Sequence, residues 1–204
     1  MPGSPRTRPA KPALSQESIV AAALALVDEF GSDAVTMRRV ATAVDTAPAS
    51  LYVYVADRNE LMALAHDLAL TGIDLPTDAD GDWRARLELL IQRVVNALSA
   101  HADIASIGRT NLATGPNSLR IIEEILWLLR LGGVADNACA WAVDLFGQYI
   151  ASSALEHATQ PPVLPTEGYP TIRALAPLLT SGDSASREAW KLRVIIDGIL
   201  AQPH

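Results

Sequence analysis

Residues 36–55 read TMRRVATAVDTAPASLYVYV, and this stretch decides the fold. Thr36 can cap a short helix, and Asp45 can end it because aspartate tolerates the left-handed backbone of a tight turn. The apolar residues between them recur at helical spacing: Met37, Val40, Ala41 and Val44. Pro48 suits the first turn of a second helix, which we expect to reach about Val55. This pattern predicts a helix-turn-helix whose second helix enters the DNA major groove.

The flanking segments predict further helices and no strands. Ser15 and Gly31 are typical of the two ends of a longer helix, and Asp57 with Glu60 forms a capping box for a helix reaching about Ile73. Beyond an acidic connection at 75–82, helices are expected at residues 83–100, 104–110, 118–131, 134–156, 171–179 and 184–201. Gly132 and Gly133 make a turn, and 160–170 is a proline-rich loop. The sequence predicts an all-α protein.

Composition excludes several classes of protein. The chain has 204 residues, 50% of them hydrophobic, which is enough for a substantial core. The net charge of −7 does not by itself indicate a partner that is a polyanion. Cys139 is the single cysteine, so an intrachain disulfide is excluded and a reducing compartment is favoured. No charge-free apolar segment approaches the ~20 residues that span a bilayer, so we expect a soluble, cytoplasmic protein without a membrane partner.

The quoted stretch, together with Asp57-Arg58 and Glu60-Leu61, resembles the DNA-binding domain of the TetR (tetracycline repressor) family, without a gap over about residues 15–64. The resemblance implies a homodimeric transcriptional repressor that a small-molecule inducer releases from palindromic, double-stranded operator DNA. It also implies the residues that contact DNA: Thr36, Arg38, Arg39, Thr46, Ala47, Pro48, Ala49, Ser50, Tyr52, Val53, Tyr54 and Arg58.

Two residues depart from the pattern of the family. Asp45 replaces the usual turn glycine, and Ala47 replaces the serine or threonine that usually caps the recognition helix. Losing that cap costs about 1 kcal/mol. Alanine and Val53 cannot form hydrogen bonds, so base reading is expected to rely on thymine methyl groups, Ser50, Tyr54 and Arg38.

We expect a disordered basic arm at 1–14, a DNA-binding domain at 15–64, and an effector-binding and dimerisation domain at 65–204. The end of the chain resembles the last helix of the tetracycline repressors, which implies that it pairs with the helix at 134–156 in a four-helix dimer interface. An effector pocket is expected among the middle helices, lined by some of Leu90, Val94, Asn111, Trp127, Trp141, Gln148 and Tyr149. Ordinary core packing is the alternative role for each of these residues.

The sequence gives no reason to expect magnesium-bound tetracycline as the effector. Two histidines, an asparagine and a phenylalanine of the tetracycline repressors align with Asp74, Gly108, Leu90 and Val94. None of the four is retained, so we expect neither a metal nor a cofactor.

Two other classes of function are alternatives to this interpretation. An enzyme is disfavoured because the four histidines lack metal-ligand spacing, and neither a phosphate-binding glycine loop nor a nucleophile motif is present. A helical ligand-binding or protein-interaction module that no longer binds DNA stays open, because the recognition surface is weakly polar. In the arm, disorder is favoured over transient DNA contacts from Arg6, Arg8 and Lys11. The operator, the effector and the sign of regulation stay open.

Overall fold

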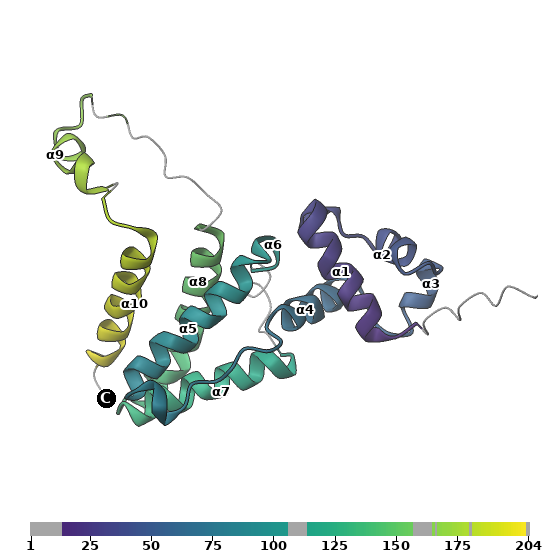
Figure 1. The fold of residues 1–204 in the computed structure, drawn as a ribbon, viewed down its shortest axis with the longest axis horizontal. Coiled ribbons are helices and arrows are strands. Elements are labelled where there is room, and N and C mark those ends of the chain that lie inside the picture. Colours follow the sequence, from purple (N-terminus) through teal and green to yellow (C-terminus); the bar gives the residue numbers. More distant parts are fainter. Residues whose placement is uncertain (1–13, 106–113, 157–164, 166, 180, 203–204) are drawn as a thin grey trace, which may run out of the picture.

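The computed structural model describes residues 14–105, 114–156, 165, 167–179 and 181–202, and within these ranges it contains helices and no strand. Figure 1 shows α1 to α3 at one end of the molecule and the larger helices at the other, with α4 between them. The elements in chain order are α1 (Gln16–Phe30), η1 (Ser32–Ala34), α2 (Met37–Ala43), α3 (Pro48–Leu51), α4 (Arg58–Ala69), η2 (Asp78–Asp80), α5 (Trp83–Ser99), α6 (Ala102–Ala105), α7 (Pro116–Leu131), α8 (Asp136–Glu156), α9 (Pro170–Leu179) and α10 (Ser184–Leu200). The predicted all-α class is confirmed.

Side-chain caps begin the N-terminal helices where the sequence predicts them. The Ser15 hydroxyl accepts the Ser18 amide, the Thr36 hydroxyl accepts the Arg39 amide, and the Asp57 carboxylate accepts the Glu60 amide. Asp45 has φ 51° and so adopts the left-handed conformation that the turn requires. Ala47 makes no side-chain cap, and Pro48 alone preorganises the first turn of α3.

Several helix boundaries differ from the prediction. α3 ends at Leu51 instead of about Val55, and the chain continues as a turn in which the Tyr54 amide donates to the Leu51 carbonyl at 2.9 Å. α4 ends at Ala69 instead of Ile73 because Gly72 adopts a left-handed φ of 79°. Of the helix predicted at 104–110, the structure describes only its start within α6, and the predicted arm lies outside the described residues except for Leu14.

The helices form two packed groups that share α4. In the first group α1 packs on α4 and α2 packs on α3, around a core containing Ile19, Val40 and Leu51. In the second group α5 packs against both α7 and α8, around a core containing Leu90 and Phe146. Because α4 contacts α1 on one side and α6 and α7 on the other, it connects the two groups.

A buried carboxylate joins α4 to α7, and we call this contact the Asp67 clasp. Asp67 Oδ1 accepts the Ser118 amide at 2.8 Å and the Ser118 hydroxyl at 2.9 Å, while Oδ2 accepts the Asn117 side-chain amide at 3.0 Å. The carboxylate lies at the N-terminus of α7, where the helix dipole favours negative charge. A Cβ on Gly115 would lie 2.2 Å from Asp67 Cγ, so this approach requires glycine.

We predict that Asp67→Asn lowers the free energy of unfolding by about 2 kcal/mol, because asparagine keeps the shape but loses the charge and one acceptor oxygen. Urea denaturation followed by circular dichroism measures this difference. Asp74→Asn is the matched control, because Asp74 is exposed and its substitution is expected to change stability by less than about 0.5 kcal/mol. Equal stability of the two variants would show that the clasp contributes nothing.

Candidate nucleic-acid interface and effector cavity

The short helix α3 has one buried face and one exposed face. Leu51 is fully buried and Val55 nearly so, and both anchor the segment in the core. Val53 between them is 81% exposed and Tyr52 is 55% exposed. The exposed face also includes Ala47, Pro48 and Ala49, with Thr46 and Ser50 half-buried. The residues predicted to read bases therefore lie largely on one accessible surface.

The two arginines of α2 have different surroundings. The Arg39 guanidinium donates to the Ala34 carbonyl at 3.2 Å and lies over the Phe30 ring, 4.4 Å from its centroid. Arg38 is exposed, and its side chain makes no hydrogen bond or ion pair with any described residue. Thr36, also exposed, uses its hydroxyl as the cap of α2. Arg38 is therefore the arginine of α2 whose charge is available to a partner.

Arg58 and Tyr54 brace the helix-turn-helix from within. Arg58 Nε donates to the Val35 carbonyl and Nη2 to the Ser32 carbonyl, both at 2.7 Å. The Tyr54 hydroxyl donates to the Leu14 carbonyl at 3.0 Å. These contacts hold α3 and the start of α4 against both ends of α1, and the DNA contacts expected of both side chains stay predictions.

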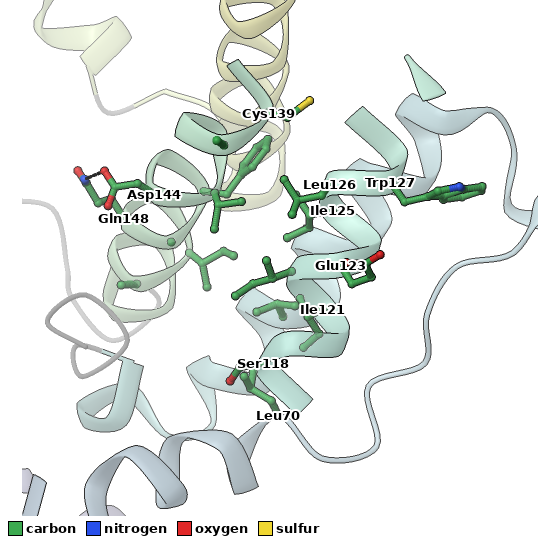
Figure 2. A pocket seen from close by; sticks show the side chains of 18 of the residues that line it. Leu70, Ser118, Ile121, Glu123, Ile125, Leu126, Trp127, Cys139, Asp144 and Gln148 are labelled. Atoms are coloured by element: carbon green, nitrogen blue, oxygen red, sulfur yellow. Dashed lines mark hydrogen bonds between the residues drawn. The ribbon is translucent and has the colours of Figure 1, made fainter. Parts of the chain in front are cut away.

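A cavity of about 760 Å³ lies among α4, α5, α7 and α8. In Figure 2, Ile121 and Ile125 of α7 lie in the space facing α8, whereas Trp127 points away from it. Apolar side chains make up most of the lining: Leu70, Val94, Leu98, Ala105, Ile121, Ile122, Ile125, Leu126, Val143, Phe146, Ile150 and Ala151. Its size and lining are typical of a site for a small organic ligand.

The residues predicted for the effector pocket are divided between several places. Val94, Trp127 and Gln148 contribute to the lining of the cavity, although the Trp127 ring is directed away from the space (Figure 2). Leu90 is fully buried in the core, and Asn111 lies outside the described residues. The Tyr149 hydroxyl donates to a Glu188 carboxylate oxygen at 2.8 Å, and Trp141 is 75% exposed on another surface. The structure does not bring these last two side chains to the cavity.

Sequence reasoning missed the two buried polar side chains of the cavity, His66 and Ser118. His66, on α4, is 6% exposed, and its burial lowers its pKa, although the neighbouring Asp67 carboxylate opposes the shift. The sequence signal that could have located His66 was its position. It directly precedes an aspartate, and it lies on an otherwise apolar face of its helix.

A second contact between the two groups of helices joins α6 to the end of α1. His101 Nδ1 lies 2.8 Å from Asp28 Oδ1, and the Ser32 amide donates to Asp103 Oδ2 at 3.1 Å. Together with the Asp67 clasp, these contacts connect the helix-turn-helix to the helices around the cavity at two places.

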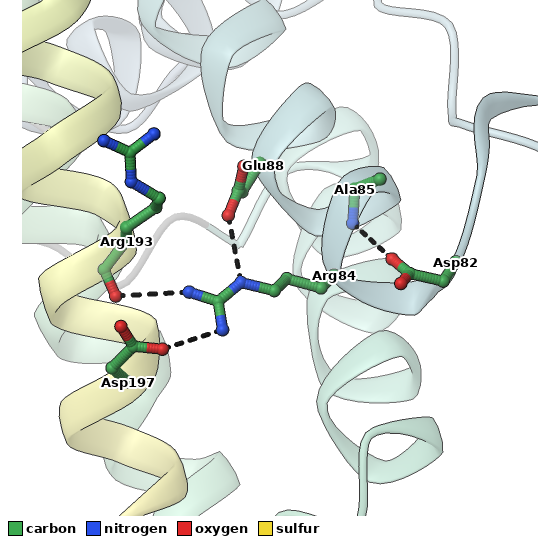
Figure 3. Close-up of polar contacts among 6 residues, drawn as sticks. All are labelled: Asp82, Arg84, Ala85, Glu88, Arg193 and Asp197. Atoms are coloured by element: carbon green, nitrogen blue, oxygen red, sulfur yellow. Dashed lines mark hydrogen bonds and ion pairs between the residues drawn. The ribbon is translucent and has the colours of Figure 1, made fainter.

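The helices α8 and α10 form an exposed apolar groove with a volume of about 590 Å³. Its walls include Trp141, Leu145 and Val194, all more than 40% exposed. Arg84 of α5 fixes α10 in place, because its Nη1 lies 2.7 Å from Asp197 Oδ1 and its Nε lies 3.2 Å from Glu88 Oε1 (Figure 3).

An accessible second helix behind a tight turn, joined by one helix to a body with an apolar cavity, defines the class of ligand-responsive helix-turn-helix regulators. Residues 19–65 match the family described as "Bacterial regulatory proteins, tetR family", and residues 75–202 match "Tetracyclin repressor-like, C-terminal domain". The chain belongs to the TetR family of transcriptional regulators.

Individual relatives support this assignment. The chain is 30% identical to the HTH-type transcriptional repressor DrrR1 of Streptomyces coeruleorubidus over 72% of its own length and 55% of that protein's. It is 25% identical to the class D tetracycline repressor protein of Escherichia coli, over 93% and 90% of the two chains. Apo ActR from Streptomyces coelicolor, known from a crystal structure, is 33% identical to this chain in sequence. The match covers 94% of this chain and 97% of the ActR chain, with a TM-score of 0.82. The chain thus spans about half the length of the first of these relatives.

The described residues show neither a metal-binding cluster nor a membrane-spanning helix. Among the described residues, no group of three or more His, Cys, Asp or Glu side chains is arranged to hold a metal ion. None of the helices in the described ranges combines the length and apolar character needed to cross a bilayer.

We predict that His66 makes the protein less stable in mild acid. Because burial lowers the pKa of His66 below its usual value of 6.5, the unfolded chain binds this proton first, and stability falls as the pH drops below about 6.5. A single group contributes at most about 1.4 kcal/mol per pH unit. Urea denaturation at pH 7.5 and 5.5 should show a smaller loss for His66→Phe than for the wild type. Equal losses would contradict the assigned protonation state.

Proposed function

We propose that this chain is a homodimeric repressor that binds a palindromic operator through α2 and α3 and leaves it when a small organic molecule fills the cavity. The exposed face of α3, opposite the buried Leu51, is the observation that carries the proposal. We assign DNA binding to residues 15–64, effector binding and dimerisation to 65–204, and no enzymatic activity. The family match supports this assignment.

Arg38 of α2 and the exposed face of α3 have different roles on DNA. Arg38 and Tyr52 contact phosphates, which fix the orientation of the unit. Pro48, Ala49 and Val53 face base edges, where their apolar groups fit thymine methyl groups, and Ser50 supplies the hydrogen bond. Arg39 and Arg58 support this surface through the carbonyls and the ring that they already hold.

The partner of the groove between α8 and α10 is a second copy of the chain. Trp141, Leu145, Val194 and the nearby Trp190 are large apolar side chains exposed on these helices, and such a patch is typical of an interface. Two copies related by a twofold axis would cover each other's patch in a four-helix arrangement. The same axis would place the two α3 helices about one turn of DNA, roughly 34 Å, apart.

The effector would act through α4. ActR, whose fold this chain shares, has been crystallised with actinorhodin and with (S)-DNPA, which supports a small organic molecule as the effector of this chain. A ligand that binds more tightly to a body in which α4 holds α3 at the wrong spacing must weaken operator binding by the same factor. Magnesium-tetracycline is not proposed, because Leu90 and Val94 supply no polar group at the aligned positions.

We predict that Arg38→Ala weakens binding to the intergenic DNA upstream of the chain's own gene about tenfold and lowers the salt dependence of binding, because each copy loses one phosphate contact. Fluorescence anisotropy with labelled DNA at two salt concentrations measures both effects. Arg173→Ala, which removes an exposed arginine of α9, is the matched control and should leave affinity unchanged. Unchanged affinity of Arg38→Ala would refute the docking, and failure of the wild type to bind at low salt would favour a module without DNA binding.

We predict that Trp141→Glu converts the dimer to a monomer, because it places a charge in the centre of the apolar groove. Sedimentation equilibrium reports the molecular mass in solution. Leu119→Glu on α7 is the control, since Leu119 is 52% exposed but lies outside the groove, and this variant should stay dimeric. A wild type that sediments as a monomer would refute the assigned interface.

A further inference from the structure

We propose that His66 is the polar contact for the effector, and that the cavity takes an uncharged, predominantly apolar molecule with one hydroxyl or carbonyl group directed at this imidazole. This inference rests on the proposed function, because it takes the molecule in the cavity to be the effector. The lining of the cavity supplies the observations.

His66 borders the cavity without a hydrogen bond to any described residue, and its ring nitrogens are not fully enclosed, since Arg86 Nε is the fully buried side-chain atom without a partner in the described part of the chain. Its side chain lines the cavity, and the residue is 6% exposed. Most buried polar side chains in proteins have a hydrogen-bonding partner, and the imidazole of His66 has none among the described residues. A ligand hydroxyl or carbonyl group in the cavity can supply this partner, so binding is favoured at this point of the wall.

The other polar groups of the cavity are already bonded or belong to exposed residues. Ser118 is the other buried polar residue in the lining, and its hydroxyl already donates to Asp67. The carboxylates of Glu123 and Asp144 belong to exposed residues, and in Figure 2 Asp144, which accepts a hydrogen bond from Gln148 at 2.7 Å, lies on the side of α8 turned away from α7. Arg130 and Asp136 pair with each other at 3.1 Å on the surface.

The polar groups of the lining determine which charge and polarity the ligand can have. The described lining offers no buried ion to neutralise a charged ligand, and a charge transferred into such surroundings without a partner is strongly disfavoured. Apart from Gln148, which bonds to Asp144, mostly apolar side chains cover the rest of the wall, so most of the ligand must be apolar. A neutral imidazole has one donor and one acceptor nitrogen, so it can bond to either a hydroxyl or a carbonyl group. A volume of about 760 Å³ accommodates a drug-sized molecule.

The position of His66 also connects the ligand to the DNA-binding unit. His66 immediately precedes Asp67, whose carboxylate holds the first turn of α7. The same helix begins at Arg58, which donates to the two carbonyls beside α2. A ligand bonded to His66 therefore acts directly on α4.

The test compares two fluorescent probes of nearly equal shape, 1-hydroxypyrene and 1-methylpyrene, which differ in one hydroxyl group. Fluorescence titration at pH 7.5 gives the dissociation constant of each probe for the full-length protein. The quantity compared between variants is the dissociation constant of 1-methylpyrene divided by that of 1-hydroxypyrene. We expect His66→Phe to lower this ratio at least about fivefold, while 1-methylpyrene still binds within about threefold of the wild type. His66→Asn, which keeps hydrogen-bonding groups, should retain part of the ratio.

His101→Phe is the matched control, because His101 lies on the surface between α1 and α6 and does not line the cavity. Circular dichroism confirms that each variant is folded. An unchanged ratio in His66→Phe, or a wild type that binds neither probe, would overturn the inference. Wild-type DNA binding is measured separately. If the wild type fails to bind DNA but the probes behave as expected, the proposed function fails and the assignment of His66 stands.

Discussion

The structure depends on a single buried carboxylate at the point where its two groups of helices meet. Asp67 is 5% exposed and accepts hydrogen bonds from the amides and side chains of Asn117 and Ser118. A buried charge of this kind cannot lose its donors without a large cost in free energy, so α4 and α7 move together or separate at a definite cost. The clasp thus sets the angle at which α4 leaves the body.

The other end of α4 is fixed equally firmly to the helix-turn-helix. Arg58 donates to two carbonyls near the start of α2, and Leu61 is fully buried in the N-terminal core. A change in the orientation of α4 therefore changes the orientation of α3 by nearly the same amount. Because the cavity is lined by His66 of this same helix and by Leu70 directly after it, a molecule in the cavity needs no long pathway to influence α3. The physical requirement for regulation is that two orientations of α4 differ in affinity for the ligand.

Local chemistry explains which parts of this arrangement could be predicted from the sequence. Caps such as Thr36 and Asp57, and the left-handed Asp45, act within one turn of the chain, and they were located correctly. The exposed face of α3 agrees with the family resemblance, which implied that Ala47, Pro48, Ala49 and Val53 face DNA. In contrast, the end of α4 depended on which conformation Gly72 adopts, which neighbouring residues do not determine.

The candidate site was harder to predict, because its key contacts join residues far apart in the chain. Nothing around Arg58 in sequence indicates that its guanidinium binds the carbonyls of Ser32 and Val35. Trp141 had the character of a pocket residue, but the orientation of α8 exposes it on the opposite surface. His66 was missed because burial next to Asp67, and not a motif, gives it a polar role in the cavity.

The most direct test of the Asp67 clasp is the distance between the two DNA-binding units of a dimer. A spin label at Val53→Cys, in a chain that also carries Cys139→Ser, gives this distance by double electron–electron resonance, since Val53 is 81% exposed. The account predicts one narrow distance distribution in the chain with Asp67 and a clearly broader or shifted one after Asp67→Asn. Identical distributions in the two proteins, or no dipolar signal in either, would contradict it.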